Sequence, residues 1–134
     1  MIVSRIATVL SLIGAAFIVY VGLNYVIAPE SVAPGFGLPA WPEGEAAAFM
    51  NLKGVCDIVL GLVILALLAA KQRYALGIAT LVIALVPFGN MLTVLRWDGS
   101  AGAAFGIHGL TAALVALTGA LLLRERSVAK AAAV

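Results

Sequence analysis

The chain has 134 residues, of which 64% are hydrophobic and 10% are charged, and its mean hydropathy is +1.18. A soluble domain of this size cannot bury so much apolar surface, because a small fold leaves much of its chain facing water. The composition therefore excludes an ordinary soluble domain and predicts an integral membrane protein. The net charge of +2 does not indicate a nucleic-acid partner, since the basic residues flank apolar runs instead of forming a patch.

Four apolar segments are each long enough to cross a bilayer as a helix, which takes about 20 mostly apolar residues. These segments are 6–27, 46–70, 74–95 and 103–123. Short polar turns join the last three of them, so we predict one all-α domain over residues 1–134, folded as an antiparallel four-helix bundle. Pro87 predicts a kink in the third span, because proline lacks the amide hydrogen that a helix interior needs.

The connection over residues 28–45 carries four prolines, a density that excludes a regular helix there. Its apolar residues, Phe36 among them, alternate with Gly and Pro and precede Trp41. The connection is therefore either a lid that covers the mouth of a pocket or a partly ordered outer loop anchored by Trp41.

The distribution of charge predicts the direction in which the four spans cross the membrane. One side of the predicted arrangement receives six of the eight Lys and Arg residues, and the other side receives most of the acidic residues. The six basic residues are Arg5, Lys71, Arg73, Arg124, Arg126 and Lys130. Because basic flanks stay in the cytoplasm, we predict a multi-pass protein of the cell membrane with both termini cytoplasmic.

A layer of polar residues is predicted at one depth in the outer half of the membrane. Lys53 and Asp57 lie one helical turn apart inside the second span, where ionised side chains are expensive and indicate a functional site. Asn24, Asn90 and His108 fall at a similar depth on the other three spans. Convergent polar groups in an apolar surround predict a pocket that opens toward the outer side. Taken singly, each residue also fits an interfacial ion pair, a packing histidine or a helix–helix contact.

Such a layer has the groups that acid–base chemistry needs. The Asp57 carboxylate could take a proton from water, while Lys53 or His108 donates a proton to oxygen on a substrate. We therefore take Asp57, Lys53 and His108 as candidate catalytic residues. The candidate binding residues are Tyr20, Asn24, Asn90, Thr111, Phe36 and Trp41. No cofactor is predicted, because the chain has no paired-histidine, cysteine or glycine-rich motif, and one His with one Asp does not predict a metal site.

Several short motifs together resemble a family of small four-helix membrane proteins, largely of unknown function and related to the DoxX-like group. The motifs are Ala28-Pro29-Glu30, Gly35-Phe36-Gly37-Leu38-Pro39, Lys53-Gly54-x-x-Asp57-x-x-x-Gly61, Val86-Pro87-x-Gly89-Asn90 and His108-Gly109-x-Thr111-Ala112. Some fungal members of that family are membrane-bound epoxide hydrolases. The resemblance implies that Asp57 activates water and that Lys53 or His108 assists epoxide opening.

Three functions follow from these patterns, in order of preference. The first is a small membrane enzyme that acts on a lipophilic small molecule by epoxide opening or hydrolysis. The second is a protein for small-molecule binding or proton-coupled transport, which would need a homodimer to form a path across the bilayer. The third is an accessory membrane subunit whose polar layer pairs with a partner helix.

Overall fold

The computed structural model describes the backbone of residues 2–131 and the side chains of residues 2–125, and this part of the chain is helical with no strand. Four helical stretches are long and apolar enough to span a membrane, which indicates a multi-pass membrane protein. These stretches are Ile2–Ile27, Gly44–Ala69, Arg73–Arg96 and Ala101–Glu125. The side chains of Arg126 and Lys130, which contributed to the predicted orientation, lie outside the described residues.

The helices α1 (Ile2–Ile27) and α3 (Ala48–Ala69) form the first of two closely packed pairs. Their backbones approach closely where Gly22 faces Gly54: a Cβ on either glycine would lie 2.6 Å from the carbonyl oxygen of the other. Small residues permit this approach in lipid, where van der Waals packing holds helices together. At the end of α1, the Asn51 side chain donates hydrogen bonds to the carbonyl oxygens of Tyr25 and Val26, at 2.9 and 3.1 Å. Asn51 thereby satisfies carbonyls that a helix end leaves unpaired.

The second pair consists of the third and fourth spans. The third span contains α4 (Arg73–Ile83) and α5 (Leu85–Arg96), and it packs on the fourth. That span contains the short helix α6 (Ala101–Ala103), the π-helix η3 (Ala104–Gly109) and α7 (Leu110–Ala131). Regular α-helix is interrupted at Ala84, three residues before Pro87. The proline ring cannot donate to the carbonyl four residues earlier and crowds it, which accounts for this interruption in the span where the sequence predicts a kink.

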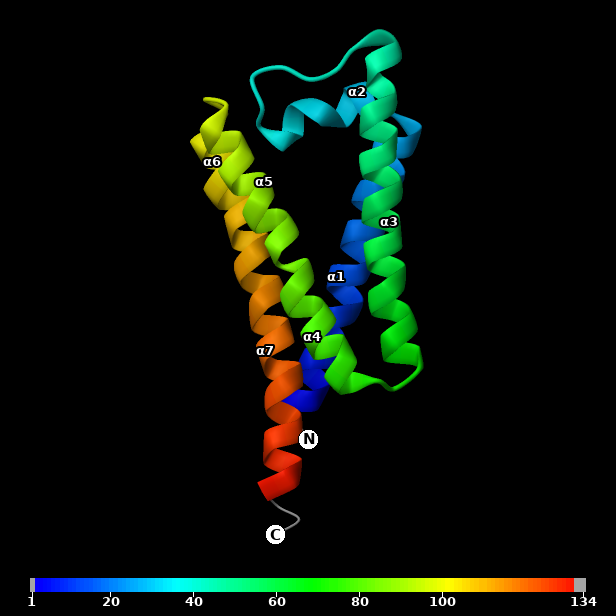
Figure 1. Ribbon diagram of the computed structural model, residues 1–134, viewed down its shortest axis with the longest axis vertical. Helices are drawn as coiled ribbons and strands as arrows, with labels where there is room; N and C mark the ends of the chain where they lie inside the picture. The colour runs from blue at the N-terminus through cyan, green and yellow to red at the C-terminus, as the bar shows by residue number, and fades with distance from the viewer. Residues whose placement is uncertain (1, 132–134) are drawn as a thin grey trace.

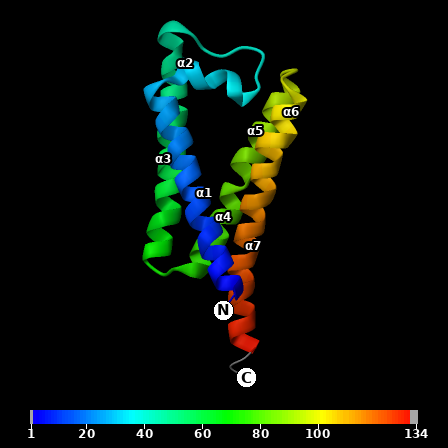
Figure 2. The ribbon, with the colours of Figure 1, turned by 180° about the vertical axis from the view of Figure 1, so that it is seen from behind.

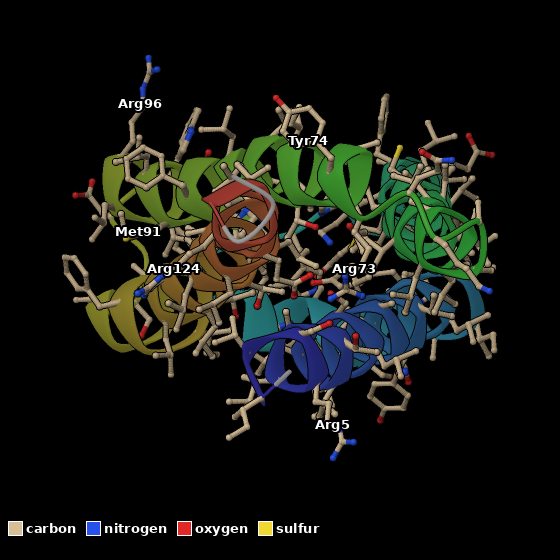
Figure 3. The ribbon with its side chains drawn as sticks, turned by 90° about the horizontal axis from the view of Figure 1, so that it is seen from below. Arg5, Arg73, Tyr74, Met91, Arg96 and Arg124 are labelled. Atoms are coloured by element: carbon tan, nitrogen blue, oxygen red, sulfur yellow. The ribbon has the colours of Figure 1, made fainter. Side chains whose placement is uncertain are left out.

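The two pairs meet near the N-terminus and separate toward the opposite end (Figures 1 and 2). Arg73 holds them together where they meet. Its guanidinium donates to both carboxylate oxygens of Glu125, at 2.6 and 2.7 Å, and to Oγ1 of Thr8 at 3.0 Å and the carbonyl of Ser4 at 3.2 Å. Figure 3 shows Arg73 turned inward between the helices, whereas Arg5 points away. This clamp joins α1, α4 and α7.

The proline-rich connection forms short helical turns and bridges the separated ends of the pairs (Figure 1). It contains α2 (Pro29–Val32), η1 (Ala33–Phe36) and η2 (Gly44–Ala47), and its first two prolines lie in first turns, where the missing amide hydrogen costs nothing. Gly37 adopts a φ of 95° and accepts a hydrogen bond of 2.8 Å from the amide of Ser100. The connection is therefore ordered and is attached to the second helix pair.

Candidate functional site

A cleft of about 340 Å³ lies between the two helix pairs beneath the connection. Most of its lining is apolar, and its polar side chains come from α1, α3, α4, α5, η3 and α7. They are Ser11, Tyr20, Asn24, Tyr25, Lys53, Asp57, Thr80, Asn90, His108, Thr111 and Thr118. Eight of the nine candidate residues from the sequence line this cleft, Phe36 included. Trp41 instead packs against a cluster formed by Tyr25, Ala33 and Met50.

Lys53 and Asp57 form the charged centre of the cleft. The Lys53 ammonium donates a hydrogen bond to Oδ2 of Asp57, a residue that is only 3% exposed. The same ammonium lies 4.5 Å from the ring centroid of Tyr25 and 5.6 Å from that of Phe36, and both rings attract a cation through their faces. Within the described residues nothing donates to Oδ1 of Asp57. One carboxylate oxygen is thus held by the ammonium, and the other is available to a water or a ligand.

His108 anchors the connection above this ion pair. It lies in the π-helix η3, and its Nε2 is 2.8 Å from the carbonyl oxygen of Phe36. A carbonyl oxygen can only accept, so Nε2 must carry the hydrogen, which leaves Nδ1 of the neutral ring as an acceptor. The His108 and Phe36 rings also pack with centroids 4.5 Å apart. His108 therefore holds Phe36 over the cleft, a contact between distant segments that the sequence did not indicate.

The amide and hydroxyl side chains of the predicted layer differ in how they are bonded. Asn24 donates to the carbonyl of Tyr20 at 2.7 Å, and Thr111 donates to that of Ile107 at 2.7 Å. The Thr111 hydroxyl hydrogen is therefore used within its own helix, whereas Asn24 uses one of its two N–H groups there. Asn90 makes no side-chain hydrogen bond to any described residue, although it lines the same cleft. Its whole side-chain amide is thus available to orient a water or a substrate.

Four polar lining residues were missed by the sequence reasoning: Ser11, Tyr25, Thr80 and Thr118. Tyr25 follows Asn24 directly and was passed over, because its contact with Lys53 depends on the register between α1 and α3. Thr80 lies on the cleft because of the way α4 packs, which the sequence does not indicate. Among the described residues, no three His, Cys, Asp or Glu side chains are grouped closely enough to share a metal ion. The chemistry on offer is that of a carboxylate, an ammonium and an amide in an apolar surround.

These features define a multi-pass helical membrane protein with a largely apolar cleft and an ion pair inside it. The family described as "Domain of unknown function (DUF4267)" matches residues 15–122, and the chain belongs to that family. The matched segment includes every residue that lines the cleft apart from Leu10, Ser11 and Gly14. None of the curated proteins and none of the solved structures compared with the chain matches it.

Proposed function

We propose that the protein is a membrane enzyme that adds water to a lipophilic epoxide in the cleft. The observation that carries this proposal is the bonding of Asp57, which lines the apolar cleft: one of its oxygens is held by Lys53, and no described residue donates to the other. A carboxylate in that state is suited to take a proton from a water molecule. Asn90, whose amide is unbonded among the described residues, supplies hydrogen bonds that orient this water.

The Lys53–Asp57 pair can make both proton transfers that the reaction requires, one from the water and one to the alkoxide. Water attacks an epoxide carbon as its proton passes to Asp57, a new C–O bond forms, and the strained C–O bond breaks. The alkoxide that leaves takes a proton from the Lys53 ammonium, which gives a diol. Asp57 then releases its proton from Oδ1 to water, Lys53 regains a proton from water, and the pair is restored without any other reactant. His108 acts as a positioning residue through its bond to Phe36.

The lining of the cleft favours a substrate that is dissolved in the bilayer. Phe17 and Tyr20 both line the cleft, yet they are 50% and 65% exposed on the surface of α1. An exposed residue of a membrane span faces lipid, so the cleft can be reached from the side. An apolar wall next to lipid selects lipophilic molecules.

We also infer that the four spans cross the cell membrane as antiparallel neighbours with both termini in the cytoplasm. Lys71, Arg73 and Arg124 support this orientation together with Arg5, because basic flanks are retained on the cytoplasmic side. A reporter that fluoresces only in the cytoplasm, fused to the C-terminus, tests it. The relation to the DoxX-like group and to fungal epoxide hydrolases remains part of this proposal.

The end where the helix pairs meet favours catalysis over transport. Leu76 and Leu122 are buried there, and the clamp between Arg73 and Glu125 lies next to them. A transport path would have to pass through this packed end. An enzyme that receives and releases its substrate laterally needs no such path.

The test is the conversion of lipophilic epoxides by purified protein in isotopically labelled water. We expect a diol that carries one labelled oxygen, and we expect Asp57→Asn to reduce its formation by about 100-fold or more, since general-base catalysis contributes about 100-fold to 10,000-fold. Asp98→Asn, which changes an exposed acid outside the cleft, serves as the matched control. Binding of the epoxides without turnover by the wild type, or full turnover by Asp57→Asn, would contradict the proposal.

A further inference from the structure

The end of the cleft farthest from Asp57 carries a second group of polar side chains. Ser11 of α1, Thr80 of α4 and Thr118 of α7 all line the cleft, and they are only 3%, 3% and 5% exposed. Three different helices thus each contribute one hydroxyl group to the same buried region. The acid–base step described above uses none of the three.

Thr80 differs from the other two in its hydrogen bonding. The Ser11 hydroxyl donates to the carbonyl of Ala7 at 2.7 Å, and that of Thr118 donates to Leu114 at 2.8 Å. Oγ1 of Thr80 is buried and has no hydrogen-bond partner within the described residues. Buried polar atoms are nearly always paired, so an unpaired one in a cleft wall indicates a missing partner. Threonine in a helix has two accessible side-chain rotamers, which allow the hydroxyl to turn toward the cleft.

The three hydroxyl side chains and the Lys53–Asp57 ion pair lie at opposite ends of the cleft. Thr118 follows His108 by ten residues, and Thr80 precedes Asn90 by ten, which corresponds to a rise of about 15 Å along a helix. Apart from Thr111, whose hydroxyl is bonded within its own helix, the lining between these levels is largely apolar. It includes Ile18, Leu60, Ile83 and Val115. A ligand that touches both levels must therefore be elongated, with an apolar middle.

We propose that the cleft binds an elongated lipophile that carries a hydroxyl group at its inner end. A hydroxyl both donates and accepts, so it can accept from Thr80 and donate to the oxygen of Ser11 or Thr118, which still have free lone pairs. The reactive group of the same molecule then lies about 15 Å away, at the level of Asp57. Only the identity of that reactive group rests on the proposed function; the binding of the hydroxyl end does not.

The experiment compares two probes that differ only at the inner end. One is a terminal epoxide of dodecane, and the other carries an added hydroxyl at its far end. Their binding is measured with purified protein in lipid nanodiscs at times too short for appreciable hydration, and hydration is followed separately. We expect the wild type to bind the hydroxylated probe about 3-fold to 10-fold more tightly, the range that one net hydrogen bond provides.

Variants of Thr80 test whether the preference arises at this level. Thr80→Val should abolish it, and Thr80→Ser, which keeps the hydroxyl, should retain it. The matched control is Thr93→Val, because Thr93 is exposed, donates to the carbonyl of Gly89 at 2.8 Å and lies outside the cleft lining.

Equal affinities for the two probes in the wild type, or an unchanged preference in Thr80→Val, would overturn this inference. If both probes bind with equal affinity and both are hydrated, the proposed function is supported and the inference about the hydroxyl end is overturned. Selective binding of the hydroxylated probe without hydration would support the inference and contradict the function. Failure of the wild type to bind either probe would contradict both.

Discussion

Two ion pairs occur among the described side chains, one toward each end of the helix pairs, and they are bonded in opposite ways. At the end where the helix pairs meet, Arg73 makes four hydrogen bonds to Glu125, Thr8 and Ser4. Both oxygens of the carboxylate are occupied by the guanidinium. A planar guanidinium with two parallel bonds to a carboxylate is a geometrically specific contact. Since its partners come from other helices, this pair cross-links the fold.

At the separated end, Lys53 and Asp57 lie one turn apart on the same helix, so their ion pair links no two elements. Asp57 keeps one oxygen free, and Lys53 stacks over aromatic rings and remains 30% exposed in its side chain. Burial and charge alone therefore do not distinguish a structural ion pair from a reactive one. The informative property is whether other groups of the protein already bond both oxygens of the carboxylate.

The same substitution at the two cations, Lys53 and Arg73, tests this difference most directly. Lys53→Gln keeps a side-chain donor for Asp57 but removes the proton that the alkoxide would receive. We expect epoxide hydration to fall by about 100-fold or more, the usual contribution of a general acid. We expect the midpoint of thermal unfolding in detergent to fall less than in Arg73→Gln, because the ion pair lies within one helix and only the ring contacts of the ammonium reach other elements. Unchanged turnover would remove Lys53 from the mechanism.

Arg73→Gln should show the reverse pattern. One amide cannot replace the four bonds of the guanidinium, so the contacts to α1 and α7 are lost together. We expect a loss of about 2 kcal/mol in the free energy of unfolding, a value reduced from that of a buried pair because Arg73 is partly exposed. Turnover per folded molecule should be retained. Arg5→Gln is the control, since Arg5 lies at the same end and points away from the helices (Figure 3).

The four spans could be predicted from the sequence because a membrane span leaves a long and continuous apolar signal. The break before Pro87 could be predicted as well, since it follows from the covalent structure of proline. The separation of the helices into two pairs could not be predicted. It depends on close approaches such as that of Gly22 to Gly54, and small residues are too common in this chain to identify which of them meet.

The candidate site was predictable to a similar extent. Charged residues in an apolar span are easily recognised, and a rise of about 1.5 Å per residue was enough to place Asn90 and His108 near the membrane depth of Lys53 and Asp57. The bonding of each residue was not predictable. The contact of His108 with the Phe36 carbonyl, and the inward position of Glu125 opposite Arg73, both require the three-dimensional arrangement.

His108 gives the smallest expected effect and the sharpest distinction between positioning and catalysis. His108→Ala removes the donor to the Phe36 carbonyl, so the connection should lose about 1 kcal/mol of local stability, the usual net value of one hydrogen bond. Hydrogen exchange at the amides of Gly37 and Ser100 reports this loss, because both amides are bonded where the connection meets the second helix pair. We expect their exchange to become about 5-fold faster.

His108→Gln separates the two roles, because its side-chain amide can place a donor close to the position of Nε2 but cannot transfer a proton at neutral pH. If His108 only positions the connection, His108→Gln should restore both slow exchange and epoxide hydration toward wild-type values. If exchange is restored while hydration stays as low as in His108→Ala, the ring itself takes part in proton transfer. In that case the reacting groups of the cleft would include His108 as well as the Lys53–Asp57 pair, and His108 would be a catalytic residue instead of a positioning residue.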